Sequence, residues 1–254
     1  MDLDLTGHRV IVTAGASGIG RAIAEAFRDE GAVVTICDID AKALTGVEGM
    51  SIAQVDVSDR DAVSRFMVQA IAAMGGLDCL VNNAGIAGPT GAVEDISPDG
   101  WDDTLAVCLT SQFNTTRMAV EALKASANGS IINLSSLAGR VGFALRSPYA
   151  AAKWGVVGFT KSLALELGPF GIRANAILPG LVAGDRQRRV LEAKAQRLGQ
   201  TFEETEAQAF SHVSIKDYVT PQQIADQCLF LASVRGRTIS GQAISVCGDT
   251  QKLA

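Results

Sequence analysis

The sequence predicts an α/β protein built on one doubly wound, parallel sheet of about seven strands. Short apolar runs alternate along the chain with longer segments in which apolar residues recur every three or four positions. Runs that are apolar almost throughout are typical of strands buried on both faces. Strands that alternate with helices form right-handed βαβ units, which build a parallel sheet flanked by helices on both faces. We expect strands at 8–13, 32–37, 51–55, 78–82, 129–135, 171–178 and 242–247.

The helical periodicity places helices near 19–30, 59–74, 100–126, 149–168, 185–209 and 221–232. No linker, repeat or low-complexity stretch interrupts this order, so we expect a single domain over 1–254. The segment 183–219 is polar, mostly helical and set between the sixth strand and the last helix. Open α/β sheets bind ligands outside the carboxyl ends of their strands, and we expect this segment to lie over that edge as a substrate lid.

Composition excludes several classes of protein. The 254 residues include 22 basic and 27 acidic side chains, a net charge of −5, and 48% are hydrophobic. This balance favours a large buried core over disorder and disfavours nucleic-acid binding. No run of about 18 apolar residues indicates a membrane-spanning helix. The chain starts at Met1 without the basic and apolar regions of a signal peptide.

Cysteine and histidine usage points to a reducing compartment. Five cysteines are scattered without a Cys-x-x-Cys spacing, and the chain has only two histidines. We therefore expect free thiols, no metal site and a cytoplasmic protein.

The first strand leads into a glycine-rich turn, TAGASGIG at 13–20, and then into a helix that opens at Arg21. Glycines let the backbone approach a pyrophosphate closely, and the helix N-terminus offers it free N–H groups and partial positive charge. A nucleotide-hydrolysing P-loop would need Lys followed by Ser or Thr, where this chain has Arg21 and Ala22. The simpler alternative is an ordinary strand–helix turn. The cofactor-binding candidates in this turn are Gly15, Ser17, Gly18, Ile19 and Gly20.

Acidic residues follow the second and third strands. Asp38 lies about 20 positions after the glycines, where a carboxylate accepts hydrogen bonds from a ribose 2′-hydroxyl and repels a 2′-phosphate. The glycine turn contains no Lys or Arg, and we therefore expect NAD rather than NADP. Alternatively, Asp38 caps a helix over 40–46. Asp56 and Val57 are further cofactor candidates; Asp56 would bind the adenine amine or, instead, cap the helix that starts near 59.

A tyrosine and a lysine share one face of the fourth long helix. Tyr149 and Lys153 are four positions apart, so their side chains are neighbours. A free tyrosine has a pKa of about 10, and ionising it near neutral pH requires about 4 kcal/mol of extra stabilisation of the phenolate. A neighbouring ammonium is the kind of group that supplies it. Taken alone, such a pair is common by chance and is usually a pair on a helix surface. Ser136 supports a functional role for the pair, because it follows the fifth strand at the carboxyl edge of the sheet, where a ligand would bind.

Together these motifs resemble the short-chain dehydrogenase/reductase family, and they follow its order over essentially the whole chain. That resemblance implies a Rossmann-type domain which transfers a hydride between a nicotinamide cofactor and an alcohol or ketone. The matching motifs are the glycine turn 13–20, Asn82-Asn83-Ala84-Gly85, Ser136, the Tyr149-Ala-Ala-Ala-Lys153 box and Pro179-Gly180.

The resemblance also implies roles for individual residues. Tyr149 would be the general acid/base, Ser136 would hold the substrate oxygen beside it, and Lys153 would bind the nicotinamide ribose and lower the pKa of the tyrosine. Asn82 and Gly85 would lie on the adenosine side of the cofactor, while Asn83 would shape the central sheet. The implied cofactor contacts beyond the glycine turn, Asp38, Asp56 and Val57 are Asn82, Ala84, Gly85, Tyr149, Lys153, Pro179, Gly180 and Val182.

Three positions depart from the family pattern. Ala14 stands where the first glycine of the turn is usual, but Gly15 follows it, so we expect the turn to be kept. Gly184 replaces a threonine that often touches the cofactor. Cys108 replaces an asparagine which, in the family, holds a helix distortion and a water of the proton relay. A thiol is a weak hydrogen-bond partner. We expect activity to be retained if the backbone kink survives, with Ser111 or Asn114 as substitutes if it does not.

The expected substrate contacts are Ser136, Leu137, Phe143, Tyr149 and Arg186. Several cations gather between 186 and 197, either as a basic lid for an anionic substrate or as a solvated helix face. Nearby glutamates favour the second interpretation, and a neutral polyol or sugar remains equally open.

Two other functions fit the sequence less well than a dehydrogenase. A non-catalytic dinucleotide-binding sensor or scaffold is supported only by Cys108 and Gly184. A serine hydrolase is excluded, because the chain has no Gly-x-Ser-x-Gly elbow and no suitably placed histidine. The two long helices over 100–126 and 149–168 are apolar on more faces than one sheet can cover, so we expect a homo-oligomer. The family resemblance implies that these helices pair between subunits, as in a homotetramer.

Overall fold

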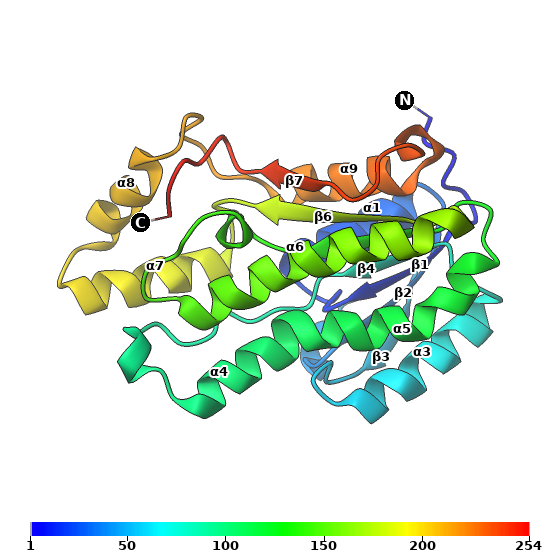
Figure 1. Ribbon diagram of the computed structural model, residues 1–254, viewed down its shortest axis with the longest axis horizontal. Helices are drawn as coiled ribbons and strands as arrows, with labels where there is room; N and C mark the ends of the chain where they lie inside the picture. The colour runs from blue at the N-terminus through cyan, green and yellow to red at the C-terminus, as the bar shows by residue number, and fades with distance from the viewer. Residues whose placement is uncertain (1, 254) are drawn as a thin grey trace.

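The computed structural model describes residues 2–253, so positions 1 and 254 of the predicted domain lie outside the described residues. It confirms the doubly wound α/β architecture (Figure 1). All seven strands run parallel, in the order β3-β2-β1-β4-β5-β6-β7. The strands are β1 (Arg9–Thr13), β2 (Val33–Asp38), β3 (Ser51–Gln54), β4 (Cys79–Asn82), β5 (Ser130–Leu134), β6 (Arg173–Pro179) and β7 (Ala243–Val246).

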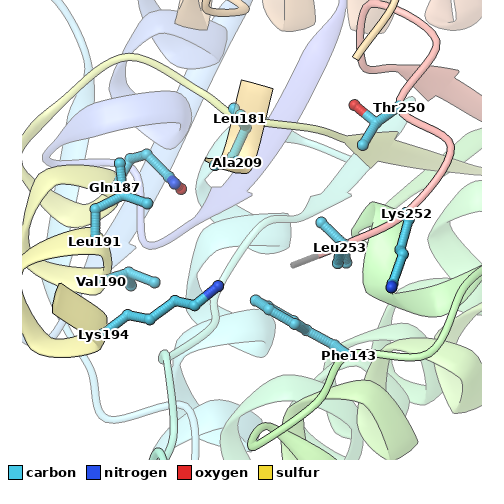
Figure 2. A pocket seen from close by; sticks show the side chains of 10 residues that line it. All are labelled: Phe143, Leu181, Gln187, Val190, Leu191, Lys194, Ala209, Thr250, Lys252 and Leu253. Atoms are coloured by element: carbon cyan, nitrogen blue, oxygen red, sulfur yellow. The ribbon is translucent and has the colours of Figure 1, made fainter. Parts of the chain in front are cut away.

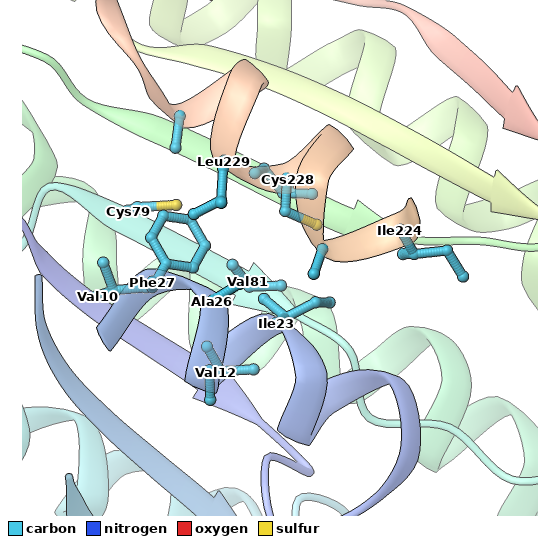
Figure 3. Packing of buried hydrophobic residues seen from close by; sticks show 14 of the residues in the cluster. Val10, Val12, Ile23, Ala26, Phe27, Cys79, Val81, Ile224, Cys228 and Leu229 are labelled. Carbon is cyan, nitrogen blue, oxygen red and sulfur yellow. The ribbon is translucent and has the colours of Figure 1, made fainter. Parts of the chain in front are cut away.

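Helices cover both faces of the sheet. On one face lie α1 (Gly18–Asp29), the short α2 (Ala41–Leu44) and α9 (Pro221–Ala232); on the other lie α3 (Arg60–Met74), α5 (Ser111–Lys124) and α6 (Ser147–Leu167). Successive side chains of β1 divide between the two cores, because Val10 and Val12 face the first layer and Ile11 the second. Figure 3 shows Phe27 of α1 packed beneath Leu229 of α9 in the first core.

Two of the predicted helices differ from the structure. The helix expected over 100–126 is built from α4 (Pro98–Leu105), a π-helical segment (Ala106–Thr110) and α5. The helix expected over 185–209 is two helices, α7 (Asp185–Leu198) and α8 (Phe202–Ser211). Gly199 ends α7 in the left-handed conformation, with φ 64°, and Thr201 starts α8 through a capping box with Glu204. Local turn chemistry thus overrides the continuous apolar periodicity.

The segment 183–219 lies beyond the carboxyl ends of β6 and β7, where Figure 1 shows α7 and α8. Its two ends meet at the sheet. The Ala183 N–H donates to the Val219 carbonyl at 2.9 Å, and the Val219 N–H donates to the Leu181 carbonyl at 2.8 Å. The segment therefore leaves and re-enters the fold at one point beside the end of β6.

All five cysteines are free and buried. Over residues 2–253, no three or more His, Cys, Asp or Glu side chains come together as metal ligands. None of the helices in this range has the length and apolar character needed to cross a membrane.

A half-buried ion pair joins Arg9 at the start of β1 to Asp78, the residue before β4, and Ser126 in the turn before β5 adds a hydrogen bond to it. The Asp78 carboxylate accepts hydrogen bonds from the Arg9 guanidinium at 2.7 and 2.8 Å, from the Arg9 backbone N–H at 2.9 Å and from the Ser126 hydroxyl at 2.6 Å. Burial raises the pKa of Asp78, but the hydrogen bonds from Arg9 and Ser126 lower it by more, so the pKa lies well below its usual value.

Replacing this carboxylate should destabilise the protein in a pH-dependent way. Asp78→Asn is expected to lower the free energy of unfolding by about 2 kcal/mol at neutral pH, the usual contribution of hydrogen bonds to a charged group. Because the folded-state pKa is depressed, this contribution is complete above the unfolded pKa of about 4 and disappears as the pH falls towards the folded value. Urea unfolding at neutral and acidic pH measures it, and the exposed Asp102→Asn is the control. An Asp78→Asn deficit that did not shrink below about pH 4 would contradict this account.

Candidate active site

The glycine turn after β1 is tightly packed and keeps its shape despite the alanine at its start. Ala14 adopts a left-handed conformation with φ 51°, which costs a residue other than glycine about 1–2 kcal/mol. The Gly15 N–H donates to the Cys37 carbonyl at 3.0 Å and fixes the turn to β2. Any side chain at Gly20 would collide with the turn, since a Cβ there would lie 2.0 Å from the Ala14 carbonyl oxygen.

The N-terminus of α1 is open for an anion. Ser17 is the N-cap but its side chain makes no capping hydrogen bond, and the first turn contains no acidic residue. Ser17 and Gly18 are exposed, and nothing lies within 4 Å of where a Gly18 side chain would begin. The first N–H groups of a helix lack intrahelical partners and attract negative charge. These residues therefore fit the pyrophosphate of a dinucleotide.

Asp38 faces this turn from the end of β2. One carboxylate oxygen accepts from the Ala16 N–H at 3.0 Å, and the other accepts from the Asp40 N–H at 3.1 Å. The alternative that Asp38 caps the following helix is wrong, because Asp40 is the N-cap of α2 and accepts from Lys42 and Ala43.

Asp56 does not cap a helix either. Asp59 is the N-cap of α3, and the exposed Asp56 accepts hydrogen bonds from the backbone and the hydroxyl of Ser58. The neighbouring Val57 packs its side chain into the core beneath α3. Of this pair, only Asp56 presents its side chain at the surface of the fold.

The Asn82-Asn83 pair has roles that the sequence did not predict. Asn82 is 1% exposed, and its amide is held by Thr115, Thr116 and Asn133 between β4, β5 and α5. Its side chain therefore cannot reach a cofactor, which corrects the expected adenosine contact. Asn83 donates to the carbonyls of Thr13 and Ala14, both at 3.0 Å, and so locks the glycine turn in place.

The structure brings Ser136, Tyr149 and Lys153 together beyond the carboxyl end of β5. Ser136 begins a short 3₁₀ turn, and its hydroxyl accepts from the Ala138 N–H at 3.1 Å. Lys153 is 3% exposed; its ammonium donates to the Leu134 carbonyl at 2.7 Å and lies 5.7 Å from the centre of the Tyr149 ring. The hydrogen bond to Leu134, the last residue of β5, thus holds the buried Lys153 amine next to the Tyr149 ring.

This environment makes Tyr149 more acidic than an ordinary tyrosine. Burial raises the pKa of Tyr149, but the charges of Lys153 and Arg186 and a hydrogen bond from Ser136 together lower the pKa by more. The second tyrosine, Tyr218, behaves in the opposite way. Burial and the neighbouring Glu206 carboxylate raise the pKa of Tyr218 above its usual value.

Cys108 occupies the kink of the long helix, and the helix distortion is present despite the replacement of the family asparagine. The π-helical segment is present, and the thiol both accepts from the Ile86 N–H at 3.4 Å and donates to the Ile86 carbonyl at 3.5 Å. The Cys108 carbonyl accepts from Gln112 at 3.3 Å. Ser111 donates within its own helix, to Val107, and so does not take over the contact with Ile86.

Gly85 lies next to Lys153 and Cys108. A Cβ on Gly85 would be 3.5 Å from the Lys153 amine and 3.6 Å from the Cys108 sulfur. Its carbonyl accepts from the Arg186 guanidinium at 3.1 Å. The loop after β4 therefore runs over the catalytic pair, and the first turn of α7 reaches across to it.

The remaining predicted residues line different parts of this edge. Pro179 is buried and Gly180 packs against Cys247, while Val182 bridges to Val219 at the base of the 183–219 segment. Leu137 is 1% exposed, so it belongs to the core and is not a substrate contact. Phe143 lines a small cavity with residues of α7, as Figure 2 shows.

Comparisons with known proteins agree with this geometry. A family model described as enoyl-(acyl carrier protein) reductase matches residues 13–248. The D-beta-hydroxybutyrate dehydrogenase of Cupriavidus necator is 38% identical over 246 residues, covering 93% of this chain and 95% of that protein. The probable galactose dehydrogenase of Rhizobium meliloti is 35% identical over 259 residues, covering 96% and 95% of the two chains.

Solved structures give the same picture. Aldohexose dehydrogenase of Thermoplasma acidophilum superimposes with a TM-score of 0.89 at 30% identity, over 100% of this chain and 98% of that one. A variant of actinorhodin polyketide ketoreductase with NADPH gives a TM-score of 0.90 at 32% identity, over 95% and 96%. Fold and site define a Rossmann-type oxidoreductase that acts on hydroxy or keto substrates. The chain belongs to the short-chain dehydrogenase/reductase family.

The two tyrosines make the acidity of Tyr149 directly measurable. Ultraviolet titration of the apoprotein should show one tyrosine ionising below the usual pKa of about 10 and one above it. Tyr149→Phe should remove the first transition and Tyr218→Phe the second. Lys153→Met should move the first transition to higher pH, because loss of the ammonium disfavours the phenolate.

Lys161→Met is the matched control, because it removes an exposed ammonium from the same helix. An unshifted first transition in Lys153→Met would contradict the coupling of the two groups.

Proposed function

We propose that this protein is an NAD-dependent dehydrogenase/reductase that interconverts a secondary alcohol and a ketone, with Tyr149 as the general acid/base. The observation that carries the proposal is the Lys153 ammonium held beneath a phenol of lowered pKa, next to the Ser136 hydroxyl. Proton transfer is most efficient when the pKa of the catalytic group lies near the working pH. A buried amine that lowers the pKa of a tyrosine favours proton transfer from a carbinol, whereas a non-catalytic scaffold has no need of it.

The chain's residues supply the proton chemistry. Ser136 would hold the carbinol oxygen beside Tyr149, and the phenolate would accept its proton as the C–O double bond forms. Lys153 would stabilise the phenolate charge throughout. A bound nicotinamide supplies the acceptor for the hydride that leaves the carbinol carbon. In the reverse direction, Tyr149 would return the proton to the oxygen of a ketone.

The choice of NAD over NADP is supported by Asp38. Its carboxylate lies at the end of β2 and is already a hydrogen-bond acceptor for the glycine turn. A 2′-hydroxyl can donate to it, whereas a 2′-phosphate would meet like charge. The first cation after the turn, Arg21, is engaged by Glu25 and by the Gly46 carbonyl, both at 2.8 Å. The solved polyketide ketoreductase with NADPH shows that this fold also accommodates the phosphorylated cofactor. The choice between NAD and NADP therefore depends on the charge beside the ribose 2′ position, here that of Asp38.

The exposed apolar side chains and the free thiols support a homotetramer and a cytoplasmic location. Phe113 on α5, Trp154 and Leu165 on α6 and Phe170 just after it are large apolar side chains in contact with solvent, Leu165 at 81% exposure. Trp154 and Leu165 are eleven positions apart, about three helical turns, and so share a face. This supports pairing of the two long helices between copies in a homotetramer. The free, buried thiols support a reducing compartment such as the cytoplasm.

Cofactor-dependent turnover tests the proposal. With a panel of secondary alcohols, the purified protein should reduce NAD and use NADP about 10- to 100-fold less efficiently, the range expected for a hydrogen bond to a charged group. Asp38→Ala should lose most of that preference, through a higher KM for NAD and a lower KM for NADP.

Asp40→Ala is the control, because it removes an acid two positions away that only caps α2. A wild-type preference for NADP would overturn the assignment of NAD. Absence of nicotinamide turnover with every alcohol would overturn the function itself.

A further inference from the structure

A buried cation without a counter-ion lies next to the catalytic tyrosine. Arg146 is 5% exposed. One of its terminal nitrogens donates to the Ala87 carbonyl, while its Nε is shielded from solvent and has no hydrogen-bond partner. Within residues 2–253, no acidic side chain forms an ion pair with Arg146. Burying an unpaired charge is costly, so such a residue is expected to have a partner that arrives from outside.

The position of Arg146 on the helix adds to this cost. It is the N-cap of the 21-residue α6, whose first turn contains no acidic residue. The N-terminal end of a helix carries partial positive charge, which favours an anion and disfavours a cation. Arg146 and the helix end therefore create a local positive potential that no acidic side chain of residues 2–253 neutralises by an ion pair.

The guanidinium is close to the reacting group. Its central carbon lies 5.2 Å from the centre of the Tyr149 ring and 5.2 Å from the centre of the Phe143 ring. Arg186 approaches from α7, with its guanidinium on the Gly85 carbonyl, and its charge acts on both Arg146 and Tyr149. Two arginines from separate elements thus converge on one phenol.

Arg188, Lys194 and Arg197 of α7 lie in different surroundings. Arg188 pairs with Glu192 at 2.8 Å, and Arg197 pairs with Asp95 at 3.3 Å, so these two belong to a solvated outer face. Lys194 instead extends across a cavity toward Phe143, as Figure 2 shows. That cavity measures ≈ 30 Å³, room for about two water-sized groups. Arg188 and Arg197 therefore belong to a solvated face, whereas Lys194 faces the cavity and the exposed Arg186 turns its guanidinium to the Gly85 carbonyl.

We propose that Arg146 and Arg186 form an anion-binding subsite beside Tyr149 and that the substrate is a hydroxy acid, or the matching keto acid, whose carboxylate this subsite binds. The planar guanidinium matches a carboxylate in shape and charge. This inference rests on the proposed chemistry at Tyr149.

Matched acid and amide substrates test the subsite. We would measure kcat/KM for four-carbon 2- and 3-hydroxy acids and for their amides, which keep the carbinol and lose the charge. Wild type should favour the better acid over its amide by about 10- to 100-fold, the range for hydrogen bonds to a charged group. Arg146→Met should lose that preference through the acid alone, and Arg146→Lys should recover part of it.

Arg188→Met is the control and should behave as wild type, because Arg188 is paired with Glu192 on the outer face. Equal turnover of acid and amide by wild type would overturn the proposal. So would equal losses for both substrates in Arg146→Met, since this would mean that Arg146 only anchors the loop at Ala87. Thermal unfolding of each variant identifies losses of activity that come from misfolding. If Arg146→Met is misfolded, the acid-to-amide preference is measured on Arg146→Lys instead.

Binding separates this inference from the proposed function. Calorimetric titration with butyrate and butyramide needs no turnover, and butyrate alone should bind, about tenfold more weakly to Arg146→Met. If no alcohol is oxidised but butyrate still binds through Arg146, the dehydrogenase function fails and the subsite stands. If alcohols are oxidised and butyrate binds no better than butyramide, the subsite fails and the function stands.

Discussion

The contact between a buried ammonium and a phenol is the interaction on which the site depends. Lys153 can lie under Tyr149 because the Leu134 carbonyl, at the last residue of β5, accepts from its amine. The end of β5 thus fixes the position of the Lys153 amine, and the four-residue spacing on α6 places Tyr149 on the same face of the helix. Burial alone would make Tyr149 less acidic, so the neighbouring cations have to outweigh it. The rest of the fold holds this pair at the carboxyl edge of the sheet, where the nicotinamide end of a dinucleotide would bind.

The sheet topology provides that place. The strand order reverses at β1, which lies between β2 and β4, and open α/β sheets bind ligands outside the carboxyl ends at such a point. Asn83 ties the end of β4 to the glycine turn after β1. Two arginines then tie the following loop to α6 and α7 through Ala87 and Gly85. The cofactor end and the substrate end of the site are therefore braced by the same short stretch of chain.

The sequence predicted the sheet, the helical layers and the grouping of Ser136, Tyr149 and Lys153, because these depend on apolar periodicity and on motif order. It did not predict which asparagine of the Asn82-Asn83 pair is buried, since both side chains have the same chemistry and only packing separates them. It also missed the break at Gly199, although the glycine was a visible stop signal within the periodic segment. Arg146 could not be identified at all, because burial without a counter-ion is a property of three-dimensional surroundings. For the same reason the thiol of Cys108 could be judged only once Ile86 was seen beside it.

The central claim is that the Tyr149 hydroxyl exchanges the proton of the substrate. Tyr149→Phe keeps the ring and its packing and removes only that oxygen. With the best alcohol and saturating cofactor, this variant is predicted to lose about 10²- to 10⁴-fold in kcat, the usual contribution of a positioned general acid/base. It should still bind the dinucleotide. A Tyr149→Phe protein that oxidised this alcohol at the wild-type rate would contradict the account.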